Sequence, residues 1–338
     1  MGLLTDLAID FSRRFGRPPQ LPLARHISRP KRALIFPAQG PGEALWSLPV
    51  IRALRKHYPD SLLSLMLDES RRSLWHFDDE VDEIIDFRPQ LLKGRGSAEF
   101  KRLKRLIKSR RFDLLLNLNY QGCPLTDYLF YKAVPGLRCG AFSKGGYPFK
   151  SVMIRQENLP QDEARRNFAM LGFLGLEAAG HPIAWPRLVD AEGRREFKER
   201  LRAEGLQKGQ QLIALDAAAF KRQSLEGFLR QAQKHSNFKL MFINSGPELQ
   251  AANPPGVLLL NSLVTVELAD ALSFAKAFIG VKNDLFSLAY LLKVPCLISA
   301  RQGERGMPEP GESLQIVSFK HKPEFPQSHA LKMLEALA

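Results

Sequence analysis

Cysteine, histidine and long apolar runs are all scarce in this chain of 338 residues. Three widely spaced cysteines and seven histidines form no metal-ligand pattern, so the sequence predicts neither a disulfide framework nor a metal site. No apolar run approaches the roughly 18 to 20 residues that a membrane-spanning helix requires. Aspartates interrupt the first apolar segment and its arginines follow it, which argues against a signal peptide. We therefore expect a cytoplasmic location with reduced thiols.

Acidic residues are outnumbered by basic ones. Lysine and arginine number 49 against 35 aspartates and glutamates, which gives a formal net charge of +14. The excess lies in residues 1–32, with seven basic and two acidic residues, and in residues 93–111, with nine and one. Both segments belong to the N-terminal half of the chain, so we expect that half to bind a polyanion or an anionic membrane. The alternative is a solvated basic face without a partner. The sequence shows neither a basic surface interleaved with aromatic residues nor a helix-turn-helix pattern, so we do not expect a nucleic acid as the partner.

The N-terminal segment predicts an amphipathic helix. The apolar residues of its one face are Leu3, Leu4, Leu7, Ala8, Phe11 and Phe15. Arginines cluster near its end, as in helices that lie in a membrane interface, but the same face could instead dock on the body of the protein. Prolines make residues 18–30 an extended connector.

The rest of the chain alternates strand and helix signals, which indicates parallel sheets with crossover helices in two domains. In the first half, strands are predicted near 32–37, 62–67, 83–87 and 113–118, and helices near 43–57, 70–77, 98–110, 124–133 and 162–176. In the second half, strands are predicted near 211–215, 239–243, 257–260, 277–279 and 296–298, and helices near 190–204, 225–235 and 328–338. Residues 140–160 predict a loop and residues 181–186 a linker.

The first strand runs into a turn, Gln39-Gly40-Pro-Gly42-Glu43, that opens a helix. The glycines allow a close backbone approach to a ligand, and the helix start leaves backbone N–H groups without partners. A carboxylate at this position can act as a general base. Alternatively, Glu43 caps the helix and interacts favourably with its dipole.

A second motif, Lys282-Asn283-Asp284-Leu-Phe-Ser287-Leu-Ala289, precedes Pro295 in register. Together with the run from Gly42-Glu43 to Pro49, it resembles glycosyltransferase family 9, the heptosyltransferases that build the lipopolysaccharide inner core. In that family the first motif is roughly Gly-Asp-x-x-x-x-x-Pro and the second roughly Asp-Thr-Gly-x-x-His-x-Ala-x-x-x-x-x-Pro. The resemblance covers about residues 31–305, and the polar positions of the second motif are all altered here.

This resemblance implies an α/β fold of the GT-B type, in which two Rossmann-like domains face each other across a cleft. It implies an acceptor-binding domain at residues 31–178 and a nucleotide-sugar-binding domain at residues 187–325. Residues 1–30 would form a basic amphipathic extension, and residues 326–338 a helix that packs back on the first domain.

The resemblance is to inverting transferases, and it implies that neither a metal nor another cofactor is needed. An acceptor hydroxyl attacks the anomeric carbon of a nucleotide-diphosphate sugar, by resemblance an ADP-sugar carrying a heptose-like group. Glu43 takes the place of the family's catalytic aspartate and is one methylene longer. The extra methylene moves the carboxylate, and the reaction rate is sensitive to the position of the catalytic group. The acceptor, an anionic glycolipid, would meet the loop residues Gln39, Gly40, Gly42, Asn119 and Tyr120.

By the same resemblance, the donor-binding residues are Lys221, Glu248, Lys282, Asn283, Asp284 and Ser287. Lys221 would contact the donor phosphates and Glu248 the ribose hydroxyls. A surface lysine and a plain turn residue are the respective alternatives. Lys282 could pair with phosphate, whereas Asp284 stands where glycine is expected and would repel it. Ser287 replaces the family's histidine.

We therefore expect a heptosyltransferase-like enzyme, cytoplasmic or peripheral on the inner membrane. Because the donor motif is altered, an alternative function is a catalytically inactive, glycosyltransferase-like binding or assembly protein. A dehydrogenase is disfavoured because Gly40-Pro-Gly42 lacks the third glycine of the dinucleotide fingerprint, and Asp68 is the nearest ribose-binding candidate.

Overall fold

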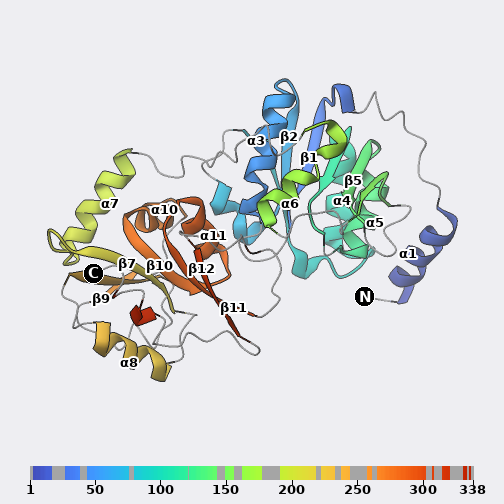
Figure 1. Ribbon diagram of the computed structural model, residues 1–338. Coiled ribbons are helices and arrows are strands. Elements are labelled where there is room, and N and C mark those ends of the chain that lie inside the picture. The colour runs from blue at the N-terminus through green and yellow to red at the C-terminus, as the bar shows by residue number, and fades with distance from the viewer. Residues whose placement is uncertain are drawn as a thin grey trace. The chain divides into compact units, whose positions relative to one another are not determined.

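A computed structural model describes most of the chain, in two compact units, Met1–Ala184 and Trp185–Ala338 (Figure 1). The described residues are 3–16, 27–38, 44–75, 80–120, 122–142, 149–155, 162–176, 191–217, 222–232, 237–243, 257–260, 265–301, 307, 314–319, 330–332 and 335. Each unit is built on a parallel six-stranded sheet with helices beside it.

The sheet of the first unit has the strand order β3-β2-β1-β4-β5-β6, and every neighbouring pair is parallel. Its strands are β1 (Arg32–Phe36), β2 (Leu62–Asp68), β3 (Glu83–Phe87), β4 (Leu114–Asn117), β5 (Leu137–Ala141) and β6 (Val152–Ile154). Its helices are α1 (Leu3–Phe15), η1 (Leu45–Ser47), α3 (Leu48–His57), η2 (Glu69–Trp75), η3 (Pro89–Leu91), α4 (Ala98–Arg110), α5 (Pro124–Ala133), α6 (Glu163–Ala169) and η5 (Gly172–Leu174). The strand order reverses between β1 and β4, which makes that pair the topological switch point.

The second unit repeats this plan with the strand order β12-β11-β10-β7-β8-β9, again parallel throughout. Its strands are β7 (Gln211–Asp216), β8 (Phe238–Ile243), β9 (Val257–Leu260), β10 (Ala275–Val281), β11 (Cys296–Arg301) and β12 (Leu314–Phe319). Its helices are α7 (Ala191–Ala203), α8 (Arg222–Ala232), α10 (Thr265–Phe274) and α11 (Asp284–Leu291). Here the switch point lies between β7 and β10.

The central strands are apolar on both faces because helices cover both sides of a parallel sheet. β1 and β4 are buried along almost their whole length, and the same holds for β7. The helix α4 shows the complementary pattern: it buries Phe100, Leu103 and Ile107 in the core of the first unit and turns its basic residues outward. The helix begins at the cap Ser97, whose hydroxyl accepts a hydrogen bond from the Phe100 N–H.

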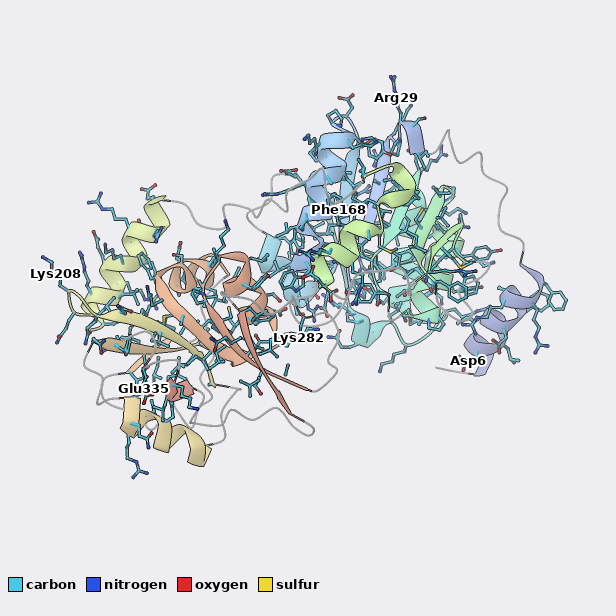
Figure 2. All side chains as sticks on the ribbon, viewed as in Figure 1. Asp6, Arg29, Phe168, Lys208, Lys282 and Glu335 are labelled. Atoms are coloured by element: carbon cyan, nitrogen blue, oxygen red, sulfur yellow. The ribbon has the colours of Figure 1, made fainter. Side chains whose placement is uncertain are left out.

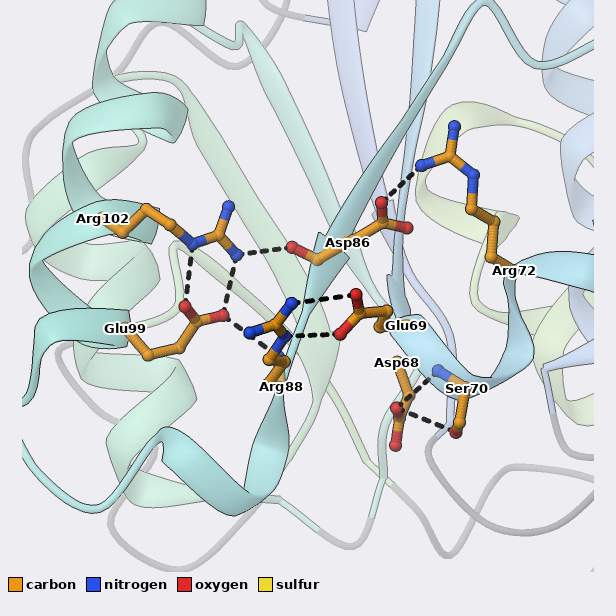
Figure 3. A network of polar contacts seen from close by, with 8 residues as sticks. All are labelled: Asp68, Glu69, Ser70, Arg72, Asp86, Arg88, Glu99 and Arg102. Carbon is orange, nitrogen blue, oxygen red and sulfur yellow. Dashed lines mark hydrogen bonds and ion pairs between the residues drawn. The ribbon is translucent and has the colours of Figure 1, made fainter.

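Arginines on α4 and on the elements near it form a network of ion pairs and hydrogen bonds (Figure 3). The Arg102 guanidinium donates to both oxygens of Glu99, at 2.8 and 2.7 Å, and it also donates to the Asp86 carbonyl. Hydrogen bonds from Arg102 hold the pKa of the largely buried Glu99 below its usual value. Arg88 pairs with Glu69 in the same network. Part of the basic charge that the sequence places in residues 93–111 is therefore already neutralised.

The predicted alternation of strands and helices is confirmed for most elements, with several differences. Residues 140–160, predicted as a loop, contain β6, and the adjacent strand β5 was not predicted. β5 carries Arg138, a residue that usually marks a surface. In the fold its guanidinium is buried and donates to the carbonyls of Phe149, Val134 and Gly136. The helix predicted at 70–77 is the 3₁₀ helix η2, and β12 was also unpredicted. The linker predicted at residues 181–186 lies outside the described residues.

Candidate functional site

The switch point of the first unit brings two predicted loops to the same edge of the sheet. Phe36 at the end of β1 pairs in register with Asn117 at the end of β4, and the Leu118 N–H donates to the Phe36 carbonyl at 2.8 Å. The turn that follows β1 and the loop that follows β4 therefore leave the sheet side by side. Ligands bind at such carboxyl ends in open α/β sheets. The predicted residues of the first turn, Gln39, Gly40, Gly42 and Glu43, lie outside the described residues, which resume at Ala44.

A buried polar cluster fixes the loop after β4. The Asn117 side-chain nitrogen donates to Asp127 Oδ1 at 2.9 Å, and Asn117 Oδ1 accepts from the Asn119 N–H at 3.0 Å. Asp127 lies 3.2 Å from the Lys150 ammonium, and both side chains are almost fully buried. Lys150 also donates to the Ala141 carbonyl at 3.0 Å. Burial raises the pKa of the Asp127 carboxyl, and the Lys150 ammonium opposes that rise.

The helix α6 adds residues that the sequence did not single out. It begins at the cap Asp162, whose carboxylate accepts from the Arg165 N–H at 2.7 Å, and it packs against η1 and α3, directly after the Glu43 turn. The Arg166 guanidinium lies 4.6 Å from the centre of the Tyr120 ring, a cation–π distance. This contact ties the predicted acceptor-side residue Tyr120 to α6.

Two further polar residues of α6, Glu163 and Asn167, are fully buried. Within the described part of the chain, the Asn167 side-chain amide has no hydrogen-bond partner for either its nitrogen or its oxygen. Such a group is costly to bury, so it needs an explanation beyond folding. The signal available in the sequence is the polar set Glu163, Arg166 and Asn167 at helical spacing on one face.

The switch point of the second unit lies where the altered motif falls. β7 and β10 run side by side, with Leu215 paired to Ile279, and they end at Asp216 and Val281. The Asn283 amide donates to Asp216 Oδ2 at 2.5 Å and so joins the two strand ends. Asn283 is also the cap of α11, because its side-chain oxygen accepts from the Phe286 N–H at 3.1 Å.

The other residues of the motif take different environments. Lys282 and Asp284 are half-buried on either side of the cap, with Lys282 between β10 and α11 (Figure 2). Ser287 is buried on the inner side of α11, and among the described residues its hydroxyl has no hydrogen-bond partner. Lys221 and Glu248 lie outside the described residues, and in the sequence Lys221 directly precedes Arg222, the first residue of α8. Lys282, Asn283, Asp284 and Ser287 thus gather at one switch point, and Asn119 and Tyr120 at the other.

Comparison with known proteins finds no matching family model and no matching curated protein. Solved structures do match along nearly the whole chain. A glycosyl transferase of family 9 from Veillonella parvula is 16% identical, with 92% of this chain and 90% of that chain covered and a TM-score of 0.69. The ADP-heptose LPS heptosyltransferase II of E. coli is 16% identical, with 90% and 98% covered and a TM-score of 0.68. The E. coli heptosyltransferase WaaC with ADP is 15% identical, with 91% and 100% covered and a TM-score of 0.67.

These likenesses bear on the fold predicted from the sequence. The α/β fold of GT-B type is confirmed, and the resemblance to family 9 is confirmed at the level of the fold. The roles predicted for individual residues stay predictions. Of these residues, the described ones lie at the two switch points, where this fold class binds ligands.

Proposed function

We propose that this chain is an inverting, metal-independent glycosyltransferase that moves a heptose-like sugar from a nucleotide-diphosphate donor to a lipopolysaccharide-core or related glycolipid acceptor. The observation that carries the proposal is the fold shared with heptosyltransferases over about nine-tenths of the chain. One of these structures holds ADP, and another structure of the same enzyme holds ADP-2-deoxy-2-fluoro heptose. An ADP-sugar is therefore the donor we favour.

In the proposed reaction, the acceptor binds at the first switch point. Its hydroxyl oxygen attacks the anomeric carbon, and the bond from that carbon to the diphosphate oxygen breaks. The bonding electrons leave with the nucleoside diphosphate, and Glu43 takes the hydroxyl proton as general base. Tyr120, which contacts the Arg166 guanidinium, is the described residue that would meet a sugar acceptor beside this turn.

The donor binds at the second switch point. Lys221 and Lys282 neutralise the diphosphate, whose negative charge grows as the bond breaks, and Glu248 accepts hydrogen bonds from the ribose hydroxyls. Asn283 has a structural role, because its side-chain nitrogen and its side-chain oxygen both form hydrogen bonds within the protein. It fixes the N-terminus of α11 next to Lys282, and the end of a helix favours an anion there.

The rival proposal is a glycosyltransferase-like protein that binds or assembles without catalysis. The specific observation in its favour is the Asp284 carboxylate in the first turn of α11, where the family has glycine. A carboxylate there competes with a diphosphate for the positive end of the helix dipole. Binding of a nucleotide diphosphate separates the two proposals, because the rival requires no donor pocket.

Replacing the proposed phosphate-binding lysines should weaken nucleotide binding. We expect Lys221→Ala to cost roughly 1.5–3 kcal/mol in binding free energy, the scale of a charge-assisted hydrogen bond, and Lys282→Ala a similar or smaller amount. Titration calorimetry with ADP, GDP and UDP measures both. Lys276→Ala is the matched control, since Lys276 is exposed near the start of β10, away from the strand end that carries Lys282. Equal affinities in all three variants would remove the second switch point as the donor site.

A further inference from the structure

The helix α1 is docked on the first unit by only one edge. Ile9 is 3% exposed and belongs to the core cluster of that unit, and α1 contacts α5. Leu7, Phe11 and Phe15 point elsewhere and remain 57%, 66% and 67% exposed. Figure 1 shows α1 beside α5, and Figure 2 marks it by Asp6. The two alternatives open from the sequence, docking on the body and facing a membrane, are therefore compatible, because different residues serve each.

The exposed side chains form an apolar patch beside a groove. The Phe11 and Phe15 rings are 4.8 Å apart and present a joint surface. With Leu7 they line a groove of about 740 Å³ between α1 and α5, whose other wall includes Tyr128 and Lys132. Bare aromatic side chains gathered on one face of a helix mark an interaction surface more often than scattered ones do.

The groove continues into a second hollow of about 260 Å³, which shares Arg95, Tyr128 and Lys132 with the first. The cations that line the two hollows are Arg14, Arg95, Lys101, Lys104 and Lys132. Asp10 is the acidic residue among the described lining residues, and it lies 3.4 Å from Arg13. The surface is strongly cationic next to the apolar patch.

The charges of α4 are divided between its faces. Arg102 and Arg110 are held by Glu99 and Glu83 on the side toward β3. Lys101 and Lys104 instead line the second hollow, where no carboxylate is among the lining residues described. Lys101 and Lys104 of α4, together with Lys132 of α5, are thus cations that face the groove.

We propose that the exposed face of α1 and this cationic groove together dock on an anionic phospholipid bilayer. The leucine and phenylalanine side chains enter the boundary between head groups and acyl chains, and the lysines and arginines meet the lipid phosphates. A second copy fits poorly, because a two-fold contact would set the same cations against each other. A nucleic acid would match the charge but leave the apolar patch bare. This inference stands on α1, α4 and α5 and does not depend on the proposed transferase activity.

Co-sedimentation of the full chain with vesicles tests the proposal. We expect binding to vesicles of phosphatidylcholine mixed with phosphatidylglycerol and little binding to phosphatidylcholine alone. At roughly 1 M salt, where the screening length is about 3 Å, most of the binding should be lost. The double variant Phe11→Ser, Phe15→Ser should weaken partitioning by about tenfold for each side chain. The triple variant Lys101→Gln, Lys104→Gln, Lys132→Gln should weaken it by about 100-fold.

Matched controls separate the effect of this surface from the effects of total charge and of exposed apolar area elsewhere on the protein. Lys198, Lys208 and Lys276 are exposed in the second unit, and changing all three to glutamine removes the same charge. Leu62→Ser removes an exposed apolar side chain from β2, away from the groove. Both controls should bind like the original chain. Equal losses in control and test variants would overturn the proposal, as would absence of binding to the mixed vesicles at low salt.

A direct report on insertion comes from Phe11→Trp. We expect its emission to shift to shorter wavelength with mixed vesicles and to be quenched by brominated acyl chains, since the ring enters the bilayer. If the emission shifts with increasing protein concentration in the absence of lipid, the face is an interface between copies. If it shifts with an oligonucleotide and not with vesicles, the partner is a nucleic acid. Either outcome overturns the lipid assignment.

Discussion

Replacing Glu43 by glutamine should lower the rate of sugar transfer by about 10²-fold or more while leaving donor affinity nearly unchanged. The amide has almost the same size as the carboxylate but cannot take the acceptor proton. Donor affinity should persist because the proposed donor residues lie in the other unit. The measurement pairs a transfer assay, which follows release of the nucleoside diphosphate, with calorimetric titration of the same preparation.

Glu43→Asp is the informative control. It restores the carboxylate of family 9 at the length found there, and we expect it to retain far more activity than Glu43→Gln. If Glu43 instead caps the helix start, Glu43→Gln should lower the thermal unfolding temperature, and activity should follow stability. A loss of donor binding equal to the loss of transfer would also contradict the role as base.

Replacing Lys150 by methionine should destabilise the first unit by about 3–5 kcal/mol, because Asp127 would be left buried without its cation. Urea unfolding followed by tryptophan emission measures this, since Trp46 and Trp75 are both buried in that unit. Burial already raises the pKa of Asp127, and loss of Lys150 would raise it further. A carboxyl with a raised pKa takes up a proton in the folded state as the pH falls. The loss of stability should therefore be full at neutral pH and shrink toward the ordinary pKa of aspartate.

The double variant Asp127→Asn, Lys150→Met tests the cause. It removes both charges and keeps an oxygen that can accept from Asn117, so it should recover most of the lost stability. A double variant as unstable as Lys150→Met would mean that packing, and not the unpaired charge, accounts for the effect.

The strands at the centre of both sheets could be predicted from the sequence, because burial on two faces produces continuous apolar runs such as Leu114–Asn117. β5 could not. The guanidinium of its Arg138 donates to carbonyls that only the folded chain brings to it, at Val134, Gly136 and Phe149. β6 has three residues, too few to show a period.

The candidate site divides in the same way. The helix that follows the motif after β10 was predictable, since cap residues act locally, whereas the turn after β1 lies outside the described residues and stays a prediction. The link from Asn283 to Asp216 joins residues 67 positions apart, and the pair of Lys150 with Asp127 is also non-local. The burial of Asn167 depends on how α6 packs against η1, which no local pattern reveals.

The central claim, a nucleotide-diphosphate sugar held at the switch point of the second unit, is tested most directly by calorimetry of the unaltered chain. Titration with ADP, GDP and UDP requires no knowledge of the sugar or the acceptor. We predict saturable binding of at least one diphosphate below millimolar concentration, with ADP favoured. Absence of binding for all three at millimolar concentration would contradict the transferase assignment and leave the non-catalytic protein as the better account.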